Sequence, residues 1–126
     1  MTVENLSILV CDDSILARKK LSDFLVSIGC SHIEQAADGQ SAINMYKELK
    51  PDLVFLDIVM PVKDGITAVK EIVAFDSDAH IVMTSSVGTQ ENLKEALKAG
   101  AKDFIQKPLD NDQIKHVIMS KVEGGK

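Results

Sequence analysis

Residues 53–56, Leu53-Val54-Phe55-Leu56, are four apolar residues in a row, and Asp57 follows them directly. A strand that helices cover on both sides of a parallel sheet carries such a continuous apolar run. A strand with one face in solvent would instead alternate apolar and polar residues. The stretch therefore predicts a central strand of a parallel sheet, with a carboxylate at its carboxyl end.

Four other short runs are rich in β-forming residues, and helical patterns separate the five runs from one another. In each helical pattern, apolar residues recur at the spacing of one helix face. Thr89 and Gly100 are typical of the start and the end of a helix, and Asp110 with Gln113 resembles a capping box. The sequence predicts strands at residues 6–10, 32–36, 53–56, 80–84 and 102–105, and helices around residues 17–28, 42–49, 66–73, 93–97 and 114–118.

Five strands that are each followed by a helix indicate an α/β protein with helices on both faces of a parallel sheet. Right-handed crossover connections leave few topologies for such a chain. The common arrangement of five units is the flavodoxin-like (βα)5 fold, a doubly wound five-stranded sheet with strand order 2-1-3-4-5. We expect one domain over residues 1–126 with a core at about residues 5–121, and no output domain.

Composition excludes several classes of protein. The chain has 126 residues and a formal net charge of −5, and Arg18 is the one arginine among fourteen basic residues. Nucleic acids and anionic membranes are usually bound by a basic face rich in Arg, so we expect neither as a partner. No apolar run approaches the ~18 residues of a membrane span, and the first residues lack the pattern of a signal peptide. Cys11 and Cys30 stand outside any CxxC motif, which favours reduced thiols in a cytoplasmic protein, and we expect a monomer.

Polar side chains gather where the predicted strands end. Asp12 and Asp13 follow the first strand, Asp57 ends the third, and Lys107 follows the fifth. In open parallel sheets, ligands bind at the carboxyl ends of the strands, at the switch point between strands 1 and 3. Three carboxylates brought together there repel one another, and a single Lys does not neutralise them. We therefore expect a divalent cation, and an all-oxygen ligand set favours Mg²⁺ or Mn²⁺.

Such a site is suited to phosphoryl transfer. Mg²⁺ prefers one or two carboxylates together with water and phosphate oxygens, so the cluster is incomplete until a phosphoryl group arrives. Phosphoryl transfer needs mainly positioning and stabilisation of charge. A carboxylate can also be the acceptor and form an acyl phosphate. Asp57 is the better candidate acceptor, because it lies alone on the central strand, opposite the pair Asp12 and Asp13.

Four blocks in this order resemble the receiver domain of response regulators, in the size of the single-domain chemotaxis (CheY-like) type. The resemblance covers nearly the whole chain, and the blocks are specific in combination although Asp12-Asp13 alone would be weak. It implies a two-component phosphorelay protein, whose self-phosphorylation and self-dephosphorylation do not make it an enzyme. The blocks are Asp12-Asp13-Ser14, residues 57–65 (Asp57 to Gly65), residues 96–104 (Ala96 to Phe104) and Lys107-Pro108.

The resemblance implies a role for each matching position. Asp57 would accept the phosphoryl group from the phosphohistidine of a sensor histidine kinase or from a small phosphodonor. Asp13 would bind Mg²⁺ directly, and Asp12 directly or through water. Asp57 and the backbone carbonyl of Val59 would complete the protein ligands of the metal. Lys107 would contact a phosphoryl oxygen, and its peptide bond to Pro108 is expected to be cis.

Two further positions match the residues that switch such domains between two states. Ser85, 22 residues before Lys107, stands where the family has Thr or Ser, and Thr84 is the competing hydroxyl. Strand alternation points Thr84 and Ser85 to opposite faces. Phe104 stands at the aromatic switch position. Phosphate on Asp57 would draw Ser85 inward and let Phe104 turn from exposed to buried, which changes the face of the fourth helix, fifth strand and fifth helix.

Departures from the family pattern lie beside the acceptor. Ser86 stands where Ala is more usual and could alter access to the phosphoryl group. Val59 and Val87 stand where polar residues often assist hydrolysis. We hypothesise that these two apolar flanks slow self-dephosphorylation by hindering the attacking water. Phe104 lacks the hydroxyl of the more usual Tyr, which some partners bind.

The resemblance implies a sensor histidine kinase, a downstream protein target and a possible phosphatase as partners. The leading pathway is chemotaxis, with the flagellar motor switch as target. Alternatives are a receiver excised from a longer regulator, or a relay intermediate. Less favoured are an aspartate-dependent phosphatase, which would need a DxD pair, a flavin-binding module, which would need a Ser/Thr-rich loop after the first strand, and a receiver-shaped domain without phosphorylation.

Overall fold

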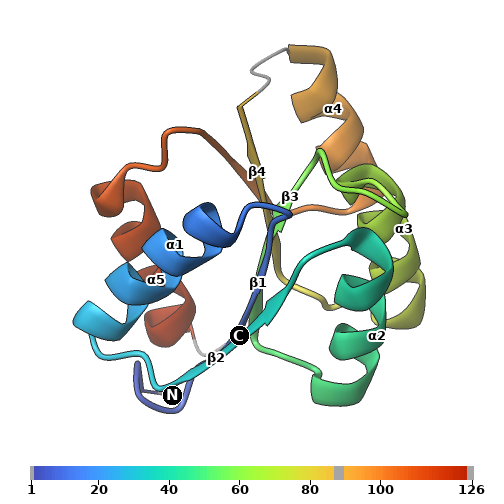
Figure 1. Cartoon of the computed structure of the whole chain (residues 1–126). Helices are drawn as coiled ribbons and strands as arrows, with labels where there is room; N and C mark the ends of the chain where they lie inside the picture. The colour runs from blue at the N-terminus through green and yellow to red at the C-terminus, as the bar shows by residue number, and fades with distance from the viewer. Residues whose placement is uncertain (1, 87–89, 125–126) are drawn as a thin grey trace.

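The computed structural model describes residues 2–86 and 90–124 and forms one parallel sheet flanked by helices (Figure 1). The strand order is β2-β1-β3-β4-β5, and every neighbouring pair is parallel, which confirms the predicted doubly wound, flavodoxin-like fold. Strand bounds differ from the predicted ones by a residue at most ends. The elements are β1 (Ser7–Cys11), α1 (Ile15–Ser27), β2 (His32–Ala36), α2 (Gly39–Leu49), β3 (Leu53–Asp57), α3 (Gly65–Phe75), β4 (Ile81–Ser85), α4 (Gln90–Ala99), β5 (Asp103–Gln106) and α5 (Asn111–Gly124).

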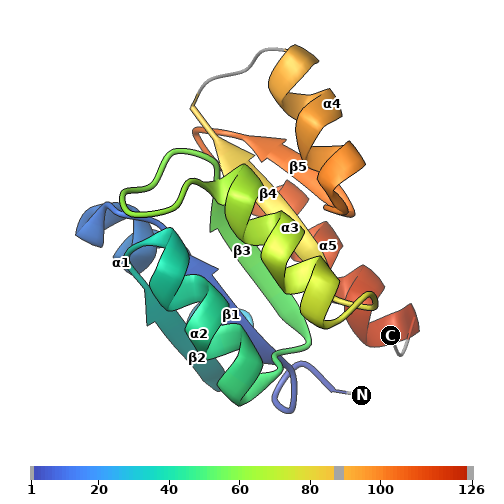
Figure 2. The same ribbon diagram turned by 90° about the vertical axis from the view of Figure 1, so that its right-hand side faces the viewer.

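Helices cover the two faces of the sheet unequally. Helices α1 and α5 lie on one face, and α2, α3 and α4 lie side by side across the other (Figures 1 and 2). No helix among the described residues is both long and apolar enough to cross a membrane. The open ends of the sheet are therefore the two poles where strands and helices meet in loops.

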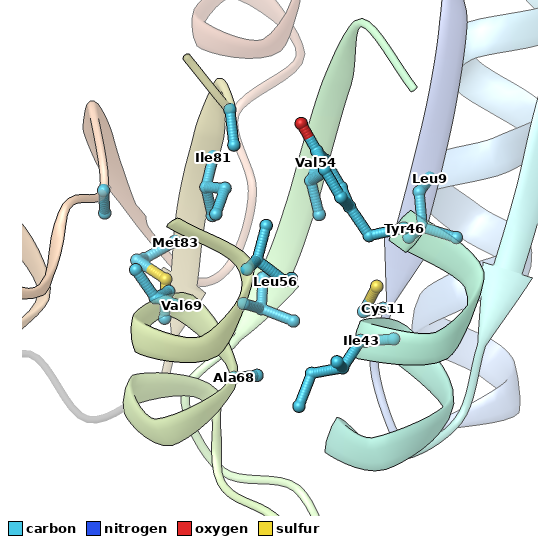
Figure 3. Packing of buried hydrophobic residues seen from close by; sticks show 14 of the residues in the cluster. Leu9, Cys11, Ile43, Tyr46, Val54, Leu56, Ala68, Val69, Ile81 and Met83 are labelled. Carbon is cyan, nitrogen blue, oxygen red and sulfur yellow. The ribbon is translucent and has the colours of Figure 1, made fainter. Parts of the chain in front are cut away.

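The strand β3 feeds both halves of the core, as its apolar run predicts. Val54 and Leu56 belong to the cluster under α2, α3 and α4, and Leu53 and Phe55 belong to the cluster under α1 and α5. Figure 3 shows the first cluster, in which side chains from β1, β3 and β4 meet those of α2 and α3. All five residues of β3 are buried, whereas the edge strand β2 buries only Ala36 fully.

Side-chain caps begin several helices at the carboxyl ends of the strands. Ser14, Asp38 and Asp64 each accept a hydrogen bond from a backbone N–H in the first turn of the helix that follows. Asp110 accepts from the backbone N–H of Asp112, at 2.8 Å, before α5. The predicted cap Thr89 lies outside the described residues. These caps satisfy helix donors that would otherwise lack a partner.

Two glycines allow the backbone to approach closely beside the end of β3. A Cβ atom on Gly65 would overlap the backbone carbonyl of Asp57, and one on Gly39 would overlap the carbonyl of Lys63. The amide of Gly65 donates to the carbonyl of Ile58 at 2.7 Å, so the close approach is held by a hydrogen bond. Both contacts fix the loop that follows Asp57.

We predict that Gly65→Ala and Gly39→Ala each lower the free energy of unfolding by about 1–3 kcal/mol, the usual cost of overpacking. The reason is that backbone atoms, unlike the far end of a side chain, cannot move aside without displacing the loop. Urea unfolding measures the change. Gly124→Ala is the control, because a Cβ there meets no atom within 4 Å. Alanine variants at positions 39 and 65 as stable as Gly124→Ala would contradict the prediction.

Candidate functional site

The register of the sheet brings three acidic side chains together. Cys11 at the end of β1 pairs with Leu56, so Asp12 and Asp13 emerge beside Asp57 at the end of β3. One carboxylate oxygen from each of the three lies within 4.8 Å of the others. Asp12 and Asp57 are each only 6% exposed, and Asp13 is exposed. The predicted cluster of carboxylates therefore forms at the carboxyl ends of the strands.

Lys107 supplies a positive charge to this cluster from the loop after β5. Its Nζ lies 2.6 Å from Asp12 Oδ2 and 3.4 Å from Asp57 Oδ2. Its backbone N–H donates to the carbonyl of Ser85 at 2.7 Å, and its peptide bond to Pro108 is cis, as the resemblance implies. Burial alone would lower the pKa of Lys107, but the two carboxylates raise it above its ordinary value. Lys107 is thus held as an ammonium between two of the three acids.

One ammonium leaves the site under-neutralised. Burial raises the pKa of Asp57 above its ordinary value, and the charge of Asp12 raises it further. Lys107 and the N–H of Val59, which donates to Asp57 at 3.4 Å, act in the opposite direction without cancelling the effect of burial. Hard carboxylate oxygens with an excess of negative charge are the donors that Mg²⁺ prefers, so these residues fit that ion.

Asp12 is positioned by contacts that reasoning from sequence did not assign. The guanidinium of Arg18 donates to the backbone carbonyl of Asp12 at 2.5 Å, and its Nε donates to the side chain of Gln35 at 3.1 Å. The N–H of Ser14 donates to the Asp12 carboxylate at 2.9 Å. The one signal in the sequence was that the single Arg of the chain lies six residues after Asp12.

The hydroxyl residues divide between the two faces of the sheet. Thr84 pairs with Asp57 across β3 and β4 and shares the face of Val82, which packs under α1 and α5. Ser85 is fully buried and comes one residue later, on the face of Met83. Ser86 is exposed beyond the strand. The opposite orientation of Thr84 and Ser85 was predicted, and which hydroxyl serves the acceptor belongs to the proposal below.

The remaining candidate residues lie around the rim. Val59 is 57% exposed beside Asp57, and Val87 lies outside the described residues. Phe104 pairs with Met83 across β4 and β5 and is half-buried against the cluster under α2, α3 and α4. Its ring lines a groove between β5 and α5 together with His116. Phe104 is therefore connected through β4 to the end of the strand that carries Ser85.

Residues 8–119 match the family model described as the response regulator receiver domain. The chain belongs to this receiver family. The chemotaxis protein CheY of Bacillus subtilis is 45% identical to it over 111 residues, which make up 88% of this chain and 92% of that protein. The chemotaxis protein CheY of Thermotoga maritima is 43% identical over 107 residues, 85% of this chain and 89% of that protein.

Solved structures agree with the family of this receiver domain. A chain in the crystal structure of the CheX–CheY–BeF3–Mg²⁺ complex from Borrelia burgdorferi superposes with a TM-score of 0.87 and 40% identity, covering 91% of this chain and 87% of that one. The fold and the family predicted from the sequence are therefore confirmed. The chain is the receiver domain of a two-component response regulator, similar to chemotaxis proteins.

We predict that Asp57→Asn stabilises the receiver domain near neutral pH when Mg²⁺ is absent. Because the pKa of Asp57 is raised on folding, the folded state binds this proton more tightly than the unfolded state does. Stability from this group is lost as pH rises from the unfolded pKa through the folded pKa, and Asn, which does not ionise, avoids the loss. We expect a gain on the order of 1 kcal/mol near neutral pH that shrinks on acidification, measured by urea unfolding.

The same experiment has two controls. Asp23→Asn removes an exposed carboxylate that pairs with Lys19, and such a change has little effect on stability. Mg²⁺ should stabilise the wild type more than Asp57→Asn, because binding to the folded state alone raises stability. A difference between Asp57→Asn and wild type that stays constant from acid to neutral pH would contradict the prediction.

Proposed function

We propose that this receiver domain accepts a phosphoryl group on Asp57 from a sensor histidine kinase in a Mg²⁺-dependent reaction, and passes the signal to a partner protein. The observation that carries the proposal is Asp57 at the end of β3, with Asp12, Asp13 and Lys107 gathered around its carboxylate. An aspartate-dependent phosphatase is less well supported, because the two acids after β1 are adjacent rather than two residues apart.

The residues divide the chemistry among them. A carboxylate oxygen of Asp57 attacks phosphorus, the bond from phosphorus to the donor nitrogen or oxygen breaks, and the leaving group keeps the electron pair. Asp12, Asp13, Asp57 and the carbonyl of Val59 would hold Mg²⁺, which neutralises charge on the transferring group. Lys107 would then pair with a phosphoryl oxygen, since its ammonium already lies 3.4 Å from Asp57.

The proposed switch runs from the acceptor to the α4-β5-α5 face. Ser85 would turn its hydroxyl toward the phosphoryl group, and Phe104 would move into the space this opens. Both residues lie on the same side of the sheet, on the adjacent strands β4 and β5, which supports a direct steric link between them. The half-buried position of Phe104 leaves its ring room to bury further. The altered face would bind the partner protein.

The relatives support chemotaxis as the pathway. Several carry the name chemotaxis protein CheY, and the Borrelia structure holds such a protein with CheX, BeF3 and Mg²⁺. We infer a histidine kinase upstream, a target such as the flagellar motor switch downstream, and a phosphatase as a further partner. A cytoplasmic monomer spanning residues 1–126 suits this role. A receiver of a longer regulator or a relay intermediate is the alternative, and partners captured with and without BeF3 distinguish them.

We predict that acetyl phosphate with Mg²⁺ adds one phosphoryl group to the wild-type chain, detected by intact mass. Asp57→Asn should abolish the adduct, because the acceptor oxygen is lost. Asp13→Asn should slow its formation by at least about tenfold, because a metal ligand is removed from an exposed position. BeF3 with Mg²⁺ should shift the NMR signals of the Phe104 ring in the wild type and not in Asp57→Asn.

The matched control for this labelling is Asp23→Asn, an exposed acid outside the site that should label like the wild type. An adduct that persists in Asp57→Asn would place the acceptor elsewhere. Full-rate labelling without Mg²⁺ would contradict the metal requirement.

We further predict that Val59→Asn speeds loss of the phosphoryl group several-fold. The side chain of Val59 is 57% exposed beside the acceptor, so an amide there could hold the attacking water in line. Release of inorganic phosphate from the labelled chain measures the rate, and Val87→Glu tests the second flank. Val26→Asn is the control, since Val26 is similarly exposed, on α1. Unchanged rates at both flanks would show that their apolar character does not set the lifetime.

A further inference from the structure

A polar pocket lies at the opposite pole of the sheet from Asp57. Its residues come from the segments that precede β3, β4 and β5 and from the ends of α2, α3 and α5. The cavity has a volume of about 780 Å³, within the range of small-molecule sites. It is lined by Tyr46, Lys50, Pro51, Asp52, Asp76, Asp78, His80, Lys102 and Lys121.

Lys121 is the unusual member of this pocket. The residue is only 8% exposed, although lysine is rarely buried without a partner. Among the described residues, its ammonium makes no hydrogen bond and no ion pair. Burial lowers its pKa, the charge of Lys102 lowers it further, and Asp52 opposes both. A buried ammonium that faces a cavity is thus left to be satisfied by whatever enters that cavity.

The surrounding cations add to the positive potential at this point. His80 has a pKa lowered by burial and by the charges of Lys121 and Lys102, with Asp103 acting against them. Lys50 is directed to the ring of Phe75, with its Nζ 5.9 Å from the ring centre. Lys102 is exposed and, among the described residues, forms no ion pair. Lys102 and Lys121 are therefore the two ammonium groups available to a ligand.

The acids of the pocket are mostly engaged within the protein. Asp76 accepts from the hydroxyl of Tyr46 at 2.7 Å and from the N–H of Asp78 at 3.0 Å. Asp52 accepts from the N–H of Ser7 at 2.9 Å. Their remaining lone pairs face hydrogen-bond donors, and their charges would repel a second anionic group. The pocket therefore suits a ligand with one anion and several donors.

We propose that this pocket binds a small molecule that carries one phosphate or carboxylate group together with hydroxyl groups. The anion would pair with Lys121 and Lys102, and the hydroxyls would donate to Asp52 and Asp78. The proposal is independent of the chemistry at Asp57, which lies at the other end of β3, roughly 13 Å away along the strand.

Titration of the ¹⁵N-labelled chain, without Mg²⁺, tests the proposal. Glycerol 3-phosphate and glycerate are the probes for the two anionic groups, and glycerol, which lacks an anion, is the control. We expect saturable shifts of the amides around His80, Lys102 and Lys121 with at least one anionic probe, and none with glycerol. No saturable shift with either probe, or shifts confined to the residues around Lys107, would overturn the proposal.

Two variants test the lysines. Lys121→Met keeps an unbranched side chain at a buried position and should weaken binding by at least about tenfold. Lys102→Met, at an exposed position, should also weaken it, so the test survives if Lys121→Met folds poorly. Lys115→Met is the matched control, exposed on α5 outside the pocket, and should bind like the wild type. Undiminished binding in folded Lys121→Met or in Lys102→Met would overturn the proposal.

Discussion

Lys107 lies between Asp12 and Asp57, and the arrangement at the carboxyl end of the sheet depends on this contact. One ammonium at 2.6 Å and 3.4 Å offsets part of the repulsion among three carboxylates and leaves the rest in place. Two of the acids are almost fully buried, so the repulsion is poorly screened by water. The same imbalance that costs the folded chain stability makes the site bind a divalent cation and a phosphoryl group.

The sheet holds this unfavourable cluster because its strands are firmly fixed in register. Asp57 ends a strand whose five residues are all buried and paired on both sides, with β1 and with β4. A slip by one residue would move every side chain of β3 to the wrong face of a core that fills both sides. The apolar run that identifies the fold is therefore also what keeps the acceptor carboxylate beside Asp12.

Much of this organisation follows from local patterns. The apolar run at residues 53–56 indicates the central strand, and the rule that parallel strands expose their carboxyl ends at one pole brings Asp12, Asp13 and Asp57 together. Contacts that depend on how separate segments pack left no such signal, as with Arg18 on the carbonyl of Asp12. Val62 is another case: its φ of 68° is one that a β-branched residue rarely adopts, and nothing local predicts it. The roles of Ser85, Ser86, Phe104 and Val59 stay predictions, and Val87 lies outside the described residues.

The two poles differ in charge for a reason built into the topology. In each β-α unit the helix runs back against its strand, so helix N-termini lie beside the acidic site and helix C-termini at the opposite pole. The partial positive charge of the N-termini favours carboxylates and phosphate, and the C-termini favour lysine. Lys47 and Lys98, in the last turns of α2 and α4, fit this account and are exposed. Lys121 in the last turn of α5 is buried, and interaction with the helix dipole does not require burial. Helix electrostatics therefore explains why lysines gather at this pole and leaves the burial of Lys121 to be explained by what its pocket binds.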